Sequence, residues 1–481
     1  MILNKLLRES AFINGKWISH SANKLSVINP ADGSLIAQVP DLGVSETKLA
    51  IEAADKAFRS WKETTAKQRS RVLYRWFQLI IENTDTLAEL LTLEQGKPLR
   101  EAKGEVLSCA YFFEWFSEEA KRTYGDNIPS NSTSTRLLTI KQPVGVVAAI
   151  TPWNFPISMI ARKAAPAIAA GCSIVIKPAE DTPLCALALA ALAEQAGVPA
   201  GVINVVTTAD AASVGHELCT HPLVRKVSFT GSTGVGKKIM ALTASTVKKT
   251  SMELGGNAPF IVFDDADIEQ AVAGAIGSKY RNAGQTCICT NRIFVQHTIY
   301  DRFIERYQQA VESLKVGSGL DQETEIGPLI NEAAVNKVDQ LVREALEEGA
   351  SLISGGAAHP AGPRFYQPTL LGDLDDNMAI SQAEIFGPVS TVFSFKDEQE
   401  VVERANNTPY GLAAYLYTRD IGRVWRVSEA LEYGMVGINE GMISNEMTPF
   451  GGVKESGIGR EGSYHGMDDY MELKYLCMGG I

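Results

Sequence analysis

Short apolar segments alternate with helical segments between residues 144 and 254, and this alternation constrains the fold more than any other feature of the sequence. The predicted strands are residues 144–150, 173–176, 202–206, 224–229 and 250–254. The helical patterns between them are residues 157–170, 184–196, 211–218 and 235–245. Apolar strands separated by helices predict a parallel, doubly wound sheet that is covered on both faces.

Polar and glycine-rich segments follow these strands directly. In sheets of this kind, ligands bind beyond the carboxyl ends of the strands. The segments that follow the strands are residues 151–156, 177–180, 230–236 and 253–256. We therefore expect them to share one ligand site.

The rest of the chain predicts helices before the sheet and a second α/β lobe after it. The early helical patterns are residues 46–61, 68–95 and 99–122, and residues 126–136 are predicted to form a loop or an exposed extended arm. The second lobe is expected to contain strands at residues 260–263, 293–296 and 389–395, with helices at residues 268–281 and 299–314.

Composition excludes several classes of function. The net charge of −11 disfavours nucleic acid or an anionic membrane as the main partner. No segment approaches the roughly 20 apolar residues of a membrane-spanning helix, and the start of the chain lacks a secretory signal. The seven cysteines contain no CxxC pair, which argues against a disulfide framework and a structural metal site. We expect a cytoplasmic enzyme without a metal.

Cys287 is the candidate nucleophile. It stands in the segment Gln285-Thr286-Cys287-Ile288-Cys289, between a predicted helix and a predicted strand. A thiolate attacks carbonyl carbons well, and a cysteine in a loop can be exposed and activated. Taken alone, however, a cysteine is more often a small buried apolar side chain.

Glu253 and Asn154 are candidates for a general base and an oxyanion donor. Glu253 ends a strand and precedes two glycines, where a carboxylate could activate water, although a solvent-facing charge is equally compatible with the pattern. Asn154 lies between Pro152 and Pro156, which would hold its amide rigidly toward a developing oxyanion. The alternative for this segment is a stiff structural turn.

Two strand-to-helix segments suit a dinucleotide. The glycines and hydroxyls of residues 229–236 could bind a phosphate at a helix N-terminus, although their spacing is not the GxGxxG fingerprint. Lys177 and Glu180 could hold ribose hydroxyls. Each segment alone is equally compatible with an ordinary capped turn.

Together these segments are highly specific, because their order and residues resemble the NAD(P)-dependent aldehyde dehydrogenases over nearly the whole chain. The matching segments are PWNFP (152–156), KPAE (177–180), FTGSTGVG (229–236), MELGGNAP (252–259), NAGQTC (282–287), EIFGP (384–388) and PFGGVKESGIGREG (449–462). The resemblance implies an α/β fold of the aldehyde dehydrogenase type, with a Rossmann-type cofactor domain, an α/β catalytic domain and a small β oligomerisation arm.

The resemblance also implies roles for individual residues. Cys287 would be the nucleophile, Glu253 would activate the water that hydrolyses a thioester, and Asn154 would form the oxyanion site with the backbone N–H of Cys287. Lys177 and Glu180 would bind the adenine-side ribose, Gly231 and Ser232 the pyrophosphate, Glu384 the other ribose and Phe386 the nicotinamide end. The implied cofactor site is completed by Thr151, Pro152, Trp153, Pro178 and Leu254.

Within the family, the chain most resembles the succinate-semialdehyde dehydrogenases. The resemblance is carried by residues 159–166, 279–289 and 441–450. It implies that Arg162, Arg281 and Ser444 hold the substrate carboxylate, which suits two guanidiniums and a hydroxyl. The alternative for the arginines is a pair of charges on helix surfaces. Glutarate semialdehyde is an alternative substrate, and an inert dinucleotide-binding or structural protein is an alternative of another class.

The resemblance predicts domain boundaries, assembly and cofactor. The cofactor domain would comprise residues 1–120 and 143–253, the catalytic domain residues 254–445, and the arm with the C-terminal segment residues 121–142 and 446–481. The arm would pair subunits into a homotetramer or homodimer. Glu180 would repel the 2′-phosphate of NADP, so NAD is the expected cofactor, with NADP also possible.

Cys289 is a candidate for redox control. It is separated from Cys287 by one residue, so a disulfide is within reach if the loop bends. Such a bridge would inactivate the nucleophile until it was reduced. The alternative is that Cys289 packs as an inert side chain at the start of the next strand.

Overall fold

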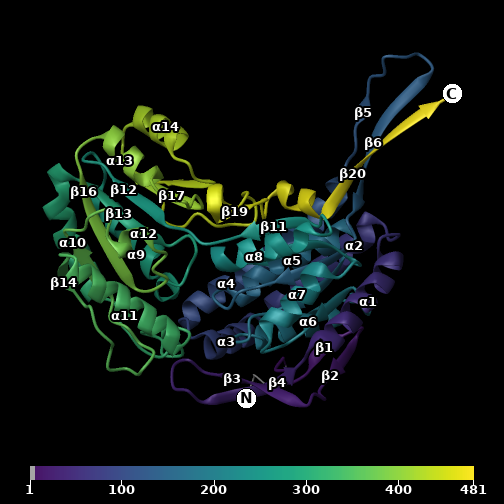
Figure 1. Cartoon of the computed structure of the whole chain (residues 1–481), viewed down its shortest axis with the longest axis horizontal. Coiled ribbons are helices and arrows are strands. Elements are labelled where there is room, and N and C mark those ends of the chain that lie inside the picture. The colour runs from purple at the N-terminus through teal and green to yellow at the C-terminus, as the bar shows by residue number, and fades with distance from the viewer. Residues whose placement is uncertain (1–5, 481) are drawn as a thin grey trace.

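The computed structural model describes residues 6–480 and shows two α/β lobes with an arm that projects from one of them (Figure 1). In the described chain, no helix combines the length and the apolar character that a membrane crossing requires. The first lobe is formed by the N-terminal half of the chain, and the second by most of the C-terminal half.

The first lobe is built on an eight-stranded sheet in the order β19-β11-β10-β7-β8-β9-β1-β2. Its central strands are parallel, and β19 and β1 pair antiparallel at the two sides. The strands are β1 (Ala11–Ile13), β2 (Lys16–Ile18), β7 (Val146–Ile150), β8 (Ser173–Lys177), β9 (Ile203–Val205), β10 (Val224–Thr230), β11 (Lys249–Glu253) and β19 (Gly457–Ile458). The predicted parallel sheet is confirmed.

The strand order reverses between β7 and β10, because β8 and β9 follow β7 on one side while β10 and β11 lie on the other. A crevice forms at such a reversal, outside the carboxyl ends of the strands. The segments after these two strands begin at Thr151 and Gly231. The topology therefore fixes the position of a ligand site before any side chain is considered.

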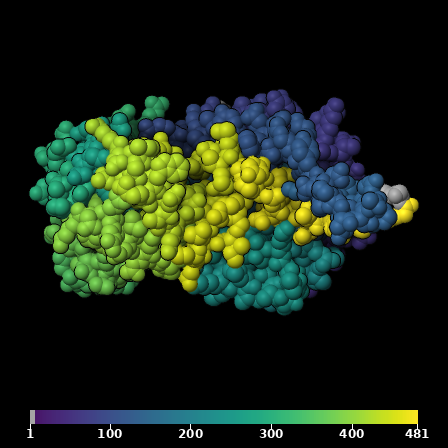
Figure 2. Space-filling view, turned by 90° about the horizontal axis from the view of Figure 1, so that it is seen from above, coloured from purple at the N-terminus to yellow at the C-terminus, as the bar shows by residue number. Residues whose placement is uncertain are grey.

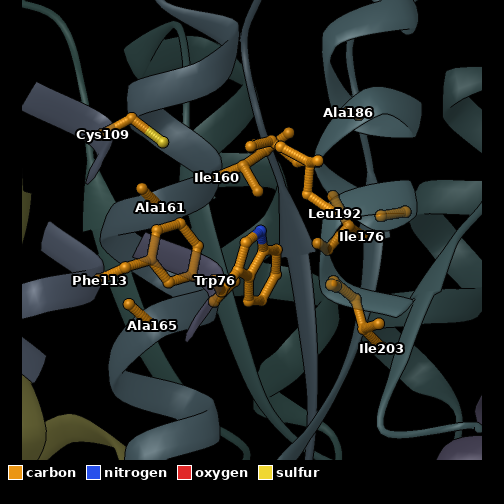
Figure 3. Close-up of a cluster of buried hydrophobic side chains, with 14 of the residues drawn as sticks. Trp76, Cys109, Phe113, Ile160, Ala161, Ala165, Ile176, Ala186, Leu192 and Ile203 are labelled. Atoms are coloured by element: carbon orange, nitrogen blue, oxygen red, sulfur yellow. The ribbon is translucent and has the colours of Figure 1, made fainter. Parts of the chain in front are cut away.

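Helices cover both faces of this sheet and make its core. Figure 3 shows Trp76 of α2 and Phe113 of α4 packed together, with ring centroids 4.2 Å apart, beside Ile160 of α5 and Ile176 of β8. The helices of this lobe are α1 (Val44–Trp61), α2 (Ala66–Glu82), α3 (Thr84–Gln95), α4 (Leu99–Glu119), α5 (Pro156–Ala170), α6 (Leu184–Gln195), α7 (Ala211–Thr220) and α8 (Thr233–Ala244). Every residue of α5 is buried, including the charged Arg162 and Lys163.

One predicted helix, residues 68–95, is two helices in the structure. The break lies at Asn83, whose side-chain amide donates to the carbonyl oxygen of Leu79. The hydroxyl of Thr84 donates to the carbonyl oxygen of Ile81. These side chains satisfy backbone acceptors at the end of α2, so the chain can turn without leaving them unpaired.

The second lobe has a seven-stranded sheet in the order β14-β15-β16-β13-β12-β17-β18. Its strands are β12 (Ala258–Val262), β13 (Thr290–Gln296), β14 (Ser351–Ser354), β15 (Thr369–Gly372), β16 (Val389–Phe395), β17 (Ala413–Tyr417) and β18 (Met435–Ile438). Its helices are α9 (Ile268–Tyr280), α10 (Tyr300–Glu312), α11 (Glu332–Glu347), α12 (Ala379–Gln382), α13 (Glu398–Asn406) and α14 (Ile421–Ala430). Strand β13 begins three residues earlier than predicted, directly after Cys289.

The arm is a three-stranded antiparallel sheet in the order β20-β6-β5, and it projects beyond both lobes (Figures 1 and 2). Its strands are β5 (Asn127–Ile128), β6 (Thr135–Pro143) and β20 (Met471–Gly479). A separate hairpin joins β3 (Asn23–Ile28) to β4 (Leu35–Asp41). The C-terminal segment lies across the junction of the lobes, where β19 pairs with β11 (Figure 2).

Candidate active site

Two cavities meet at Cys287. The first, of about 250 Å³, is lined by Pro152, Trp153, Asn154, Met159, Thr230, Gly231, Ser232, Leu254, Gly255, Cys287, Ala334, Lys337, Glu384 and Phe386. The second, of about 340 Å³, is lined by Arg100, Glu101, Gly104, Glu105, Ser108, Phe155, Ser158, Met159, Arg162, Arg281, Thr286, Cys287, Ile288, Met442, Ser444 and Phe450. A thiol shared by two cavities can react with a molecule in one while a second molecule occupies the other.

The backbone before Cys287 is tightly wound. Asn282, Ala283 and Gly284 all have left-handed φ angles, of 52°, 54° and 74°. Glycine is required at the last of these, because a Cβ there would collide with the carbonyl oxygen of Gly387. The N–H of Cys289 donates to the carbonyl oxygen of Thr286 at 3.2 Å and closes a turn. This turn places Cys287 at the edge of both cavities.

Burial, together with the nearby Glu384 carboxylate, raises the pKa of the Cys287 thiol to about 12, while the Arg162 guanidinium lowers it. The raised pKa favours the protonated thiol, whereas the sequence led us to expect an activated thiolate. The thiol is desolvated, so its activation requires a base or a bound positive charge.

Asn154 lines the first cavity and is held there by hydrogen bonds. Its Nδ2 donates to the carbonyl oxygen of Gln285 at 3.0 Å, two residues before the nucleophile. Its own carbonyl oxygen accepts from Lys97 Nζ at 2.8 Å and from Asn282 Nδ2 at 2.9 Å. The Asn154 amide is thus tied to the loop that carries Cys287.

Lys97 and Glu105 support this segment, and the sequence analysis missed both. Lys97 Nζ lies 2.5 Å from Glu105 Oε2, and both side chains are buried. The other carboxylate oxygen of Glu105 accepts from the backbone N–H groups of Ile157 and Ser158, at the start of α5. The pair therefore holds the N-terminus of α5 and, through Lys97, the backbone of Asn154.

Glu253 ends β11 and is buried, but it is not among the residues that line the two cavities. Its Oε2 has no hydrogen-bond partner in the described structure. Burial, together with the carboxylate of Glu461, raises its pKa well above the usual value. The side chain is therefore enclosed and is not the solvent-facing charge that the sequence pattern also allowed.

The surroundings of Glu253 contain further buried charges that the sequence did not reveal. Lys163 Nζ lies 2.5 Å from Glu461 Oε1 and 2.7 Å from the hydroxyl of Thr230. Arg162 Nη1 lies 3.9 Å from Glu461 Oε2. These groups couple the protonation of Glu253 to an ion-pair network between α5 and the C-terminal segment.

Most of the predicted cofactor residues line the first cavity. Those that do are Pro152, Trp153, Gly231, Ser232, Leu254, Glu384 and Phe386. Thr151, Lys177, Pro178 and Glu180 do not line it. Lys177 Nζ lies 3.2 Å from Glu180 Oε2, and this pair follows β8, the strand next to β7. The two residues stand at the adjoining strand end rather than in the cavity itself.

The first cavity fits a nicotinamide dinucleotide. Ser232 precedes α8 without a side-chain capping bond, so the backbone N–H groups of the first turn can meet a pyrophosphate. Gly231 leaves space, because a Cβ there would strike the ring of Phe229. Glu384 accepts from the backbone N–H of Gly256 at 3.0 Å, and burial raises its pKa to about 7.

The aromatic end of this cavity is made by Trp153 and Phe386, whose rings meet edge to face at 5.6 Å. Lys337, which the sequence analysis did not select, lines the same cavity and donates to the carbonyl oxygen of Glu384 at 2.7 Å. Glu384 is thus fixed through both its carboxylate and its backbone.

The second cavity collects the predicted carboxylate-binding residues. Arg162 Nη2 donates to the hydroxyl of Ser444 at 2.7 Å, while its Nε and Nη1 are buried without a hydrogen-bond partner in the described structure. The Nε of Arg281 is likewise buried without a hydrogen-bond partner in the described structure. Buried guanidinium donors without partners are costly unless an anion satisfies them. Arg162 is therefore buried rather than a helix-surface charge, Arg281 is half-buried, and the donors without partners are available to an anionic ligand.

Cys289 is buried and lines neither cavity. Its Sγ lies 3.5 Å from Nζ of Lys279, which is fully buried near the end of α9. The structure thus brings Cys289 against a lysine that the sequence analysis did not select.

This arrangement defines an enzyme class: a cysteine enzyme with a dinucleotide cavity on one side of its thiol and an anion cavity on the other. The aldehyde dehydrogenase family model matches residues 17–476, and the chain belongs to this family. Three similar proteins agree with that assignment. A succinate-semialdehyde dehydrogenase [NADP(+)] of Escherichia coli is 57% identical over 477 residues, covering 99% of each chain.

A glutarate-semialdehyde dehydrogenase of Pseudomonas aeruginosa is 56% identical over 478 residues, again covering 99% of each chain. A crystal structure of an Escherichia coli NADP-dependent enzyme matches with a TM-score of 0.98 at 57% identity and covers 99% of each chain. The predicted family and fold class are confirmed.

Proposed function

We propose that this enzyme oxidises succinate semialdehyde to succinate with a nicotinamide dinucleotide. The observation that carries the proposal is the set of buried guanidinium nitrogens without a hydrogen-bond partner in the described structure, Nε and Nη1 of Arg162 and Nε of Arg281, in the cavity next to Cys287. They bind the carboxylate of the substrate by charge-assisted hydrogen bonds, with the hydroxyl of Ser444 as a third donor. The aldehyde end is then directed toward the thiol.

The chemistry begins at Cys287. Its Sγ attacks the aldehyde carbon, and the developing oxyanion accepts hydrogen bonds from Asn154 Nδ2 and the backbone N–H of Cys287. The residues of the first cavity would hold an oxidised nicotinamide, which would accept the hydride when the thiohemiacetal on Cys287 becomes a thioester. Glu253 then takes a proton from the water that hydrolyses the thioester.

Glu253 needs two changes before that last step. Its side chain must turn from its enclosed position toward Cys287, and it must lose the proton that burial favours. Lys163 and Arg162 lower its pKa and so assist this loss. The charge network around Glu461 therefore belongs to the proposed site.

The cofactor is proposed to be NAD, with NADP also accepted. Lys177 lies beside the Glu180 carboxylate and offsets part of its charge, so repulsion of a 2′-phosphate is reduced but not removed. The similar Escherichia coli enzyme is named for NADP(+), which supports use of both cofactors. The adenine-side ribose would lie near Lys177, Pro178 and Glu180, and Thr151 would join β7 to this end of the site.

Glutarate semialdehyde is the second candidate substrate. The similar Pseudomonas enzyme is named for it, and one methylene is worth only about 1–3 kcal/mol in a pocket. An inert dinucleotide-binding protein is less well supported, because the thiol, the amide and both arginines are all at the site.

We also propose the domain division, assembly and compartment given by the sequence. The first sheet, apart from β19, lies within residues 1–120 and 143–253, and the second within residues 254–445. The arm of residues 121–142 and the C-terminal strand would join two or four subunits. The seven cysteines are unpaired, which supports a reducing compartment such as the cytoplasm.

The test is a steady-state assay at 340 nm with both cofactors and matched aldehydes. The wild type should prefer succinate semialdehyde to butanal, the neutral aldehyde of the same length, and should use NAD with the higher kcat/KM. Arg162→Ala and Arg281→Ala should each raise KM for the semialdehydes roughly 10- to 100-fold, because a hydrogen bond to a charged group is worth about 1.5–3 kcal/mol. The same variants should change KM for butanal little.

The aldehyde panel also contains glutarate semialdehyde, and a higher kcat/KM for it would assign the second substrate. Equal losses for charged and neutral aldehydes would make the arginines structural and refute the proposed carboxylate site. An absence of turnover with every aldehyde and both cofactors would favour the inert protein.

A further inference from the structure

We propose that Lys279 and Cys289 form a reversible oxidative cross-link, a sulfenamide between Nζ and Sγ, behind the active site. Neither side chain takes part in the proposed catalytic steps, and neither lines the two cavities. The proposal therefore concerns a modification site that is independent of substrate identity.

The geometry places a lysine amine directly against a thiol. Lys279 Nζ lies 3.5 Å from Cys289 Sγ, and the lysine side chain is fully buried. Within residues 6–480, this sulfur is the one hydrogen-bond partner of the amine, and no carboxylate forms an ion pair with it. Buried lysines are otherwise almost always paired with an opposite charge.

Burial favours the neutral forms of both groups, and their contact opposes this effect at each of them. Burial lowers the pKa of Lys279, so the neutral amine with its free lone pair becomes more accessible than in water. Burial raises the pKa of Cys289, and the adjacent Lys279 opposes that increase. The pair can share one proton, so a neutral amine beside a thiol and an ammonium beside a thiolate are both available.

The same geometry disfavours the disulfide that the sequence suggested. The turn closed between Thr286 and Cys289 leaves Cys287 on the cavities and Cys289 outside them, against Lys279. A bridge between the two cysteines would require this turn to open. Lys279 is already in contact, so an oxidised Cys289 meets the amine first.

The reaction uses hydrogen peroxide as the oxidant. The thiol of Cys289 is oxidised by two electrons to a sulfenic acid, and the peroxide is reduced with release of one water. The Nζ lone pair then attacks the sulfur, so that an S–N bond forms and the S–O bond breaks. The departing hydroxide takes a proton from the nitrogen and leaves as a second water. Thiols reverse the product by attack on sulfur.

The cross-link would protect the active site. A sulfenic acid that condenses with a nitrogen is withdrawn from further oxidation to the irreversible sulfinic acid. Cys287 keeps its thiol, unlike in a Cys287–Cys289 disulfide. The bond would also tie the end of α9, which leads to Arg281, to the loop that carries the nucleophile.

The test is a peptide map of the wild-type enzyme after peroxide treatment and blocking of free thiols with iodoacetamide. Trypsin normally cleaves after Lys279, but it should fail there when Nζ is bonded to sulfur. We expect residues 250–281 linked to residues 282–292, with a mass two hydrogens below the sum of the separate peptides. Cys287 in this species should carry the iodoacetamide label, and dithiothreitol should separate the peptides.

Four variants sharpen the result. Lys279→Met and Cys289→Ser should each abolish the linked species, whereas Cys477→Ser, at an exposed thiol, should leave it unchanged. Cys287→Ser should also retain it, because the nucleophile is not a partner. If Lys279→Met fails to fold, the wild-type map and the cysteine variants still decide the matter.

Three outcomes would overturn the proposal. In the first, Cys287 escapes the label and is joined to Cys289, which assigns the disulfide instead. In the second, Cys289 becomes a sulfinic acid while trypsin still cleaves fully after Lys279. In the third, Cys289 stays reduced at peroxide doses that oxidise Cys477.

Discussion

The state of Cys287 illustrates how a single residue departs from its sequence motif. The motif predicts the nucleophile, but burial and the neighbouring Glu384 raise the pKa of its thiol. The thiolate fraction therefore grows only as the pH of the solution approaches the thiol pKa of about 12, because a raised pKa moves deprotonation to higher pH.

We predict that iodoacetamide alkylates Cys287 slowly at neutral pH, at a rate that keeps rising with pH up to the limit of enzyme stability. The measurement is the rate of inactivation by iodoacetamide from pH 6 to pH 10, with Cys477→Ser as the background protein. A rate that levels off near neutral pH would mean that the thiol is already activated.

Glu253 is the second residue whose role depends on its surroundings. We predict that Glu253→Gln slows hydrolysis of the thioester by about 10²- to 10⁴-fold, since this is the usual contribution of a general base. Formation of the thioester should continue, so one equivalent of reduced cofactor should appear in a burst before slow turnover. Rapid-mixing kinetics measure both phases.

A second variant, Glu461→Gln, separates the base from its neighbours. Glu461→Gln alters the charge that raises the pKa of Glu253 but keeps the carboxyl group of Glu253 itself. It should therefore shift the pH profile of deacylation without producing the burst. Normal deacylation in Glu253→Gln would assign the water activation to another group.

At the scale of elements, sequence patterns predicted the sheet but not its internal supports. The strands after residue 144 and the segments at their carboxyl ends follow from local patterns of apolar, polar and glycine residues. Lys97 and Glu105 were missed because their partners are distant in the sequence. Lys97 contacts the backbone of Asn154, 57 residues later, and Glu105 accepts from the start of α5. Lys163 and Glu461 are 298 residues apart, so no local pattern reveals their contact.

The backbone before Cys287 was also unpredictable in detail. The segment Asn282-Ala283-Gly284 contains one glycine, yet three successive residues adopt left-handed φ angles. Alanine rarely adopts this conformation, so its presence there is imposed by tertiary contacts rather than by local preference. One such contact is the hydrogen bond from the N–H of Asn282 to Glu101 Oε2 on α4.

We predict that Lys97→Met impairs the start of α5 and the position of Asn154 together. It leaves Glu105 buried without its partner, and breaking a buried ion pair costs about 3–5 kcal/mol. Thermal unfolding should occur at a clearly lower temperature, and kcat should fall more than KM rises, because the oxyanion donor moves while Arg162 and Arg281 remain.

Lys103→Met is the matched control, since Lys103 on α4 forms an exposed ion pair with Asp85 on α3 at 2.8 Å. Exposed pairs contribute about 0–1 kcal/mol, so this variant should retain stability and kcat. If Lys97→Met lost stability but kept the wild-type kcat, Lys97 would support the fold without positioning Asn154.

At the scale of the whole molecule, the arm is the feature that a single chain does not explain. Strand β20 lies at an edge of its three-stranded sheet and exposes large apolar side chains. Leu473 is 63% exposed and Tyr475 is 58% exposed. An exposed apolar edge strand is a template for pairing with another chain. This supports the proposed assembly through the arm.

We therefore predict that Leu473→Lys combined with Tyr475→Lys dissociates the assembly, because two charges would be placed on an edge that is otherwise covered by another subunit. Light scattering after size-exclusion chromatography should show a mass near the 52.0 kDa of one chain for the variant and a multiple of it for the wild type. Glu472→Lys and Lys474→Glu together change the charges of the same strand but keep its apolar side chains, so this variant should stay assembled. A wild-type mass of 52.0 kDa would show that the arm is exposed in solution. An unchanged mass for the variant with Leu473→Lys and Tyr475→Lys would place the subunit contact elsewhere on the molecule.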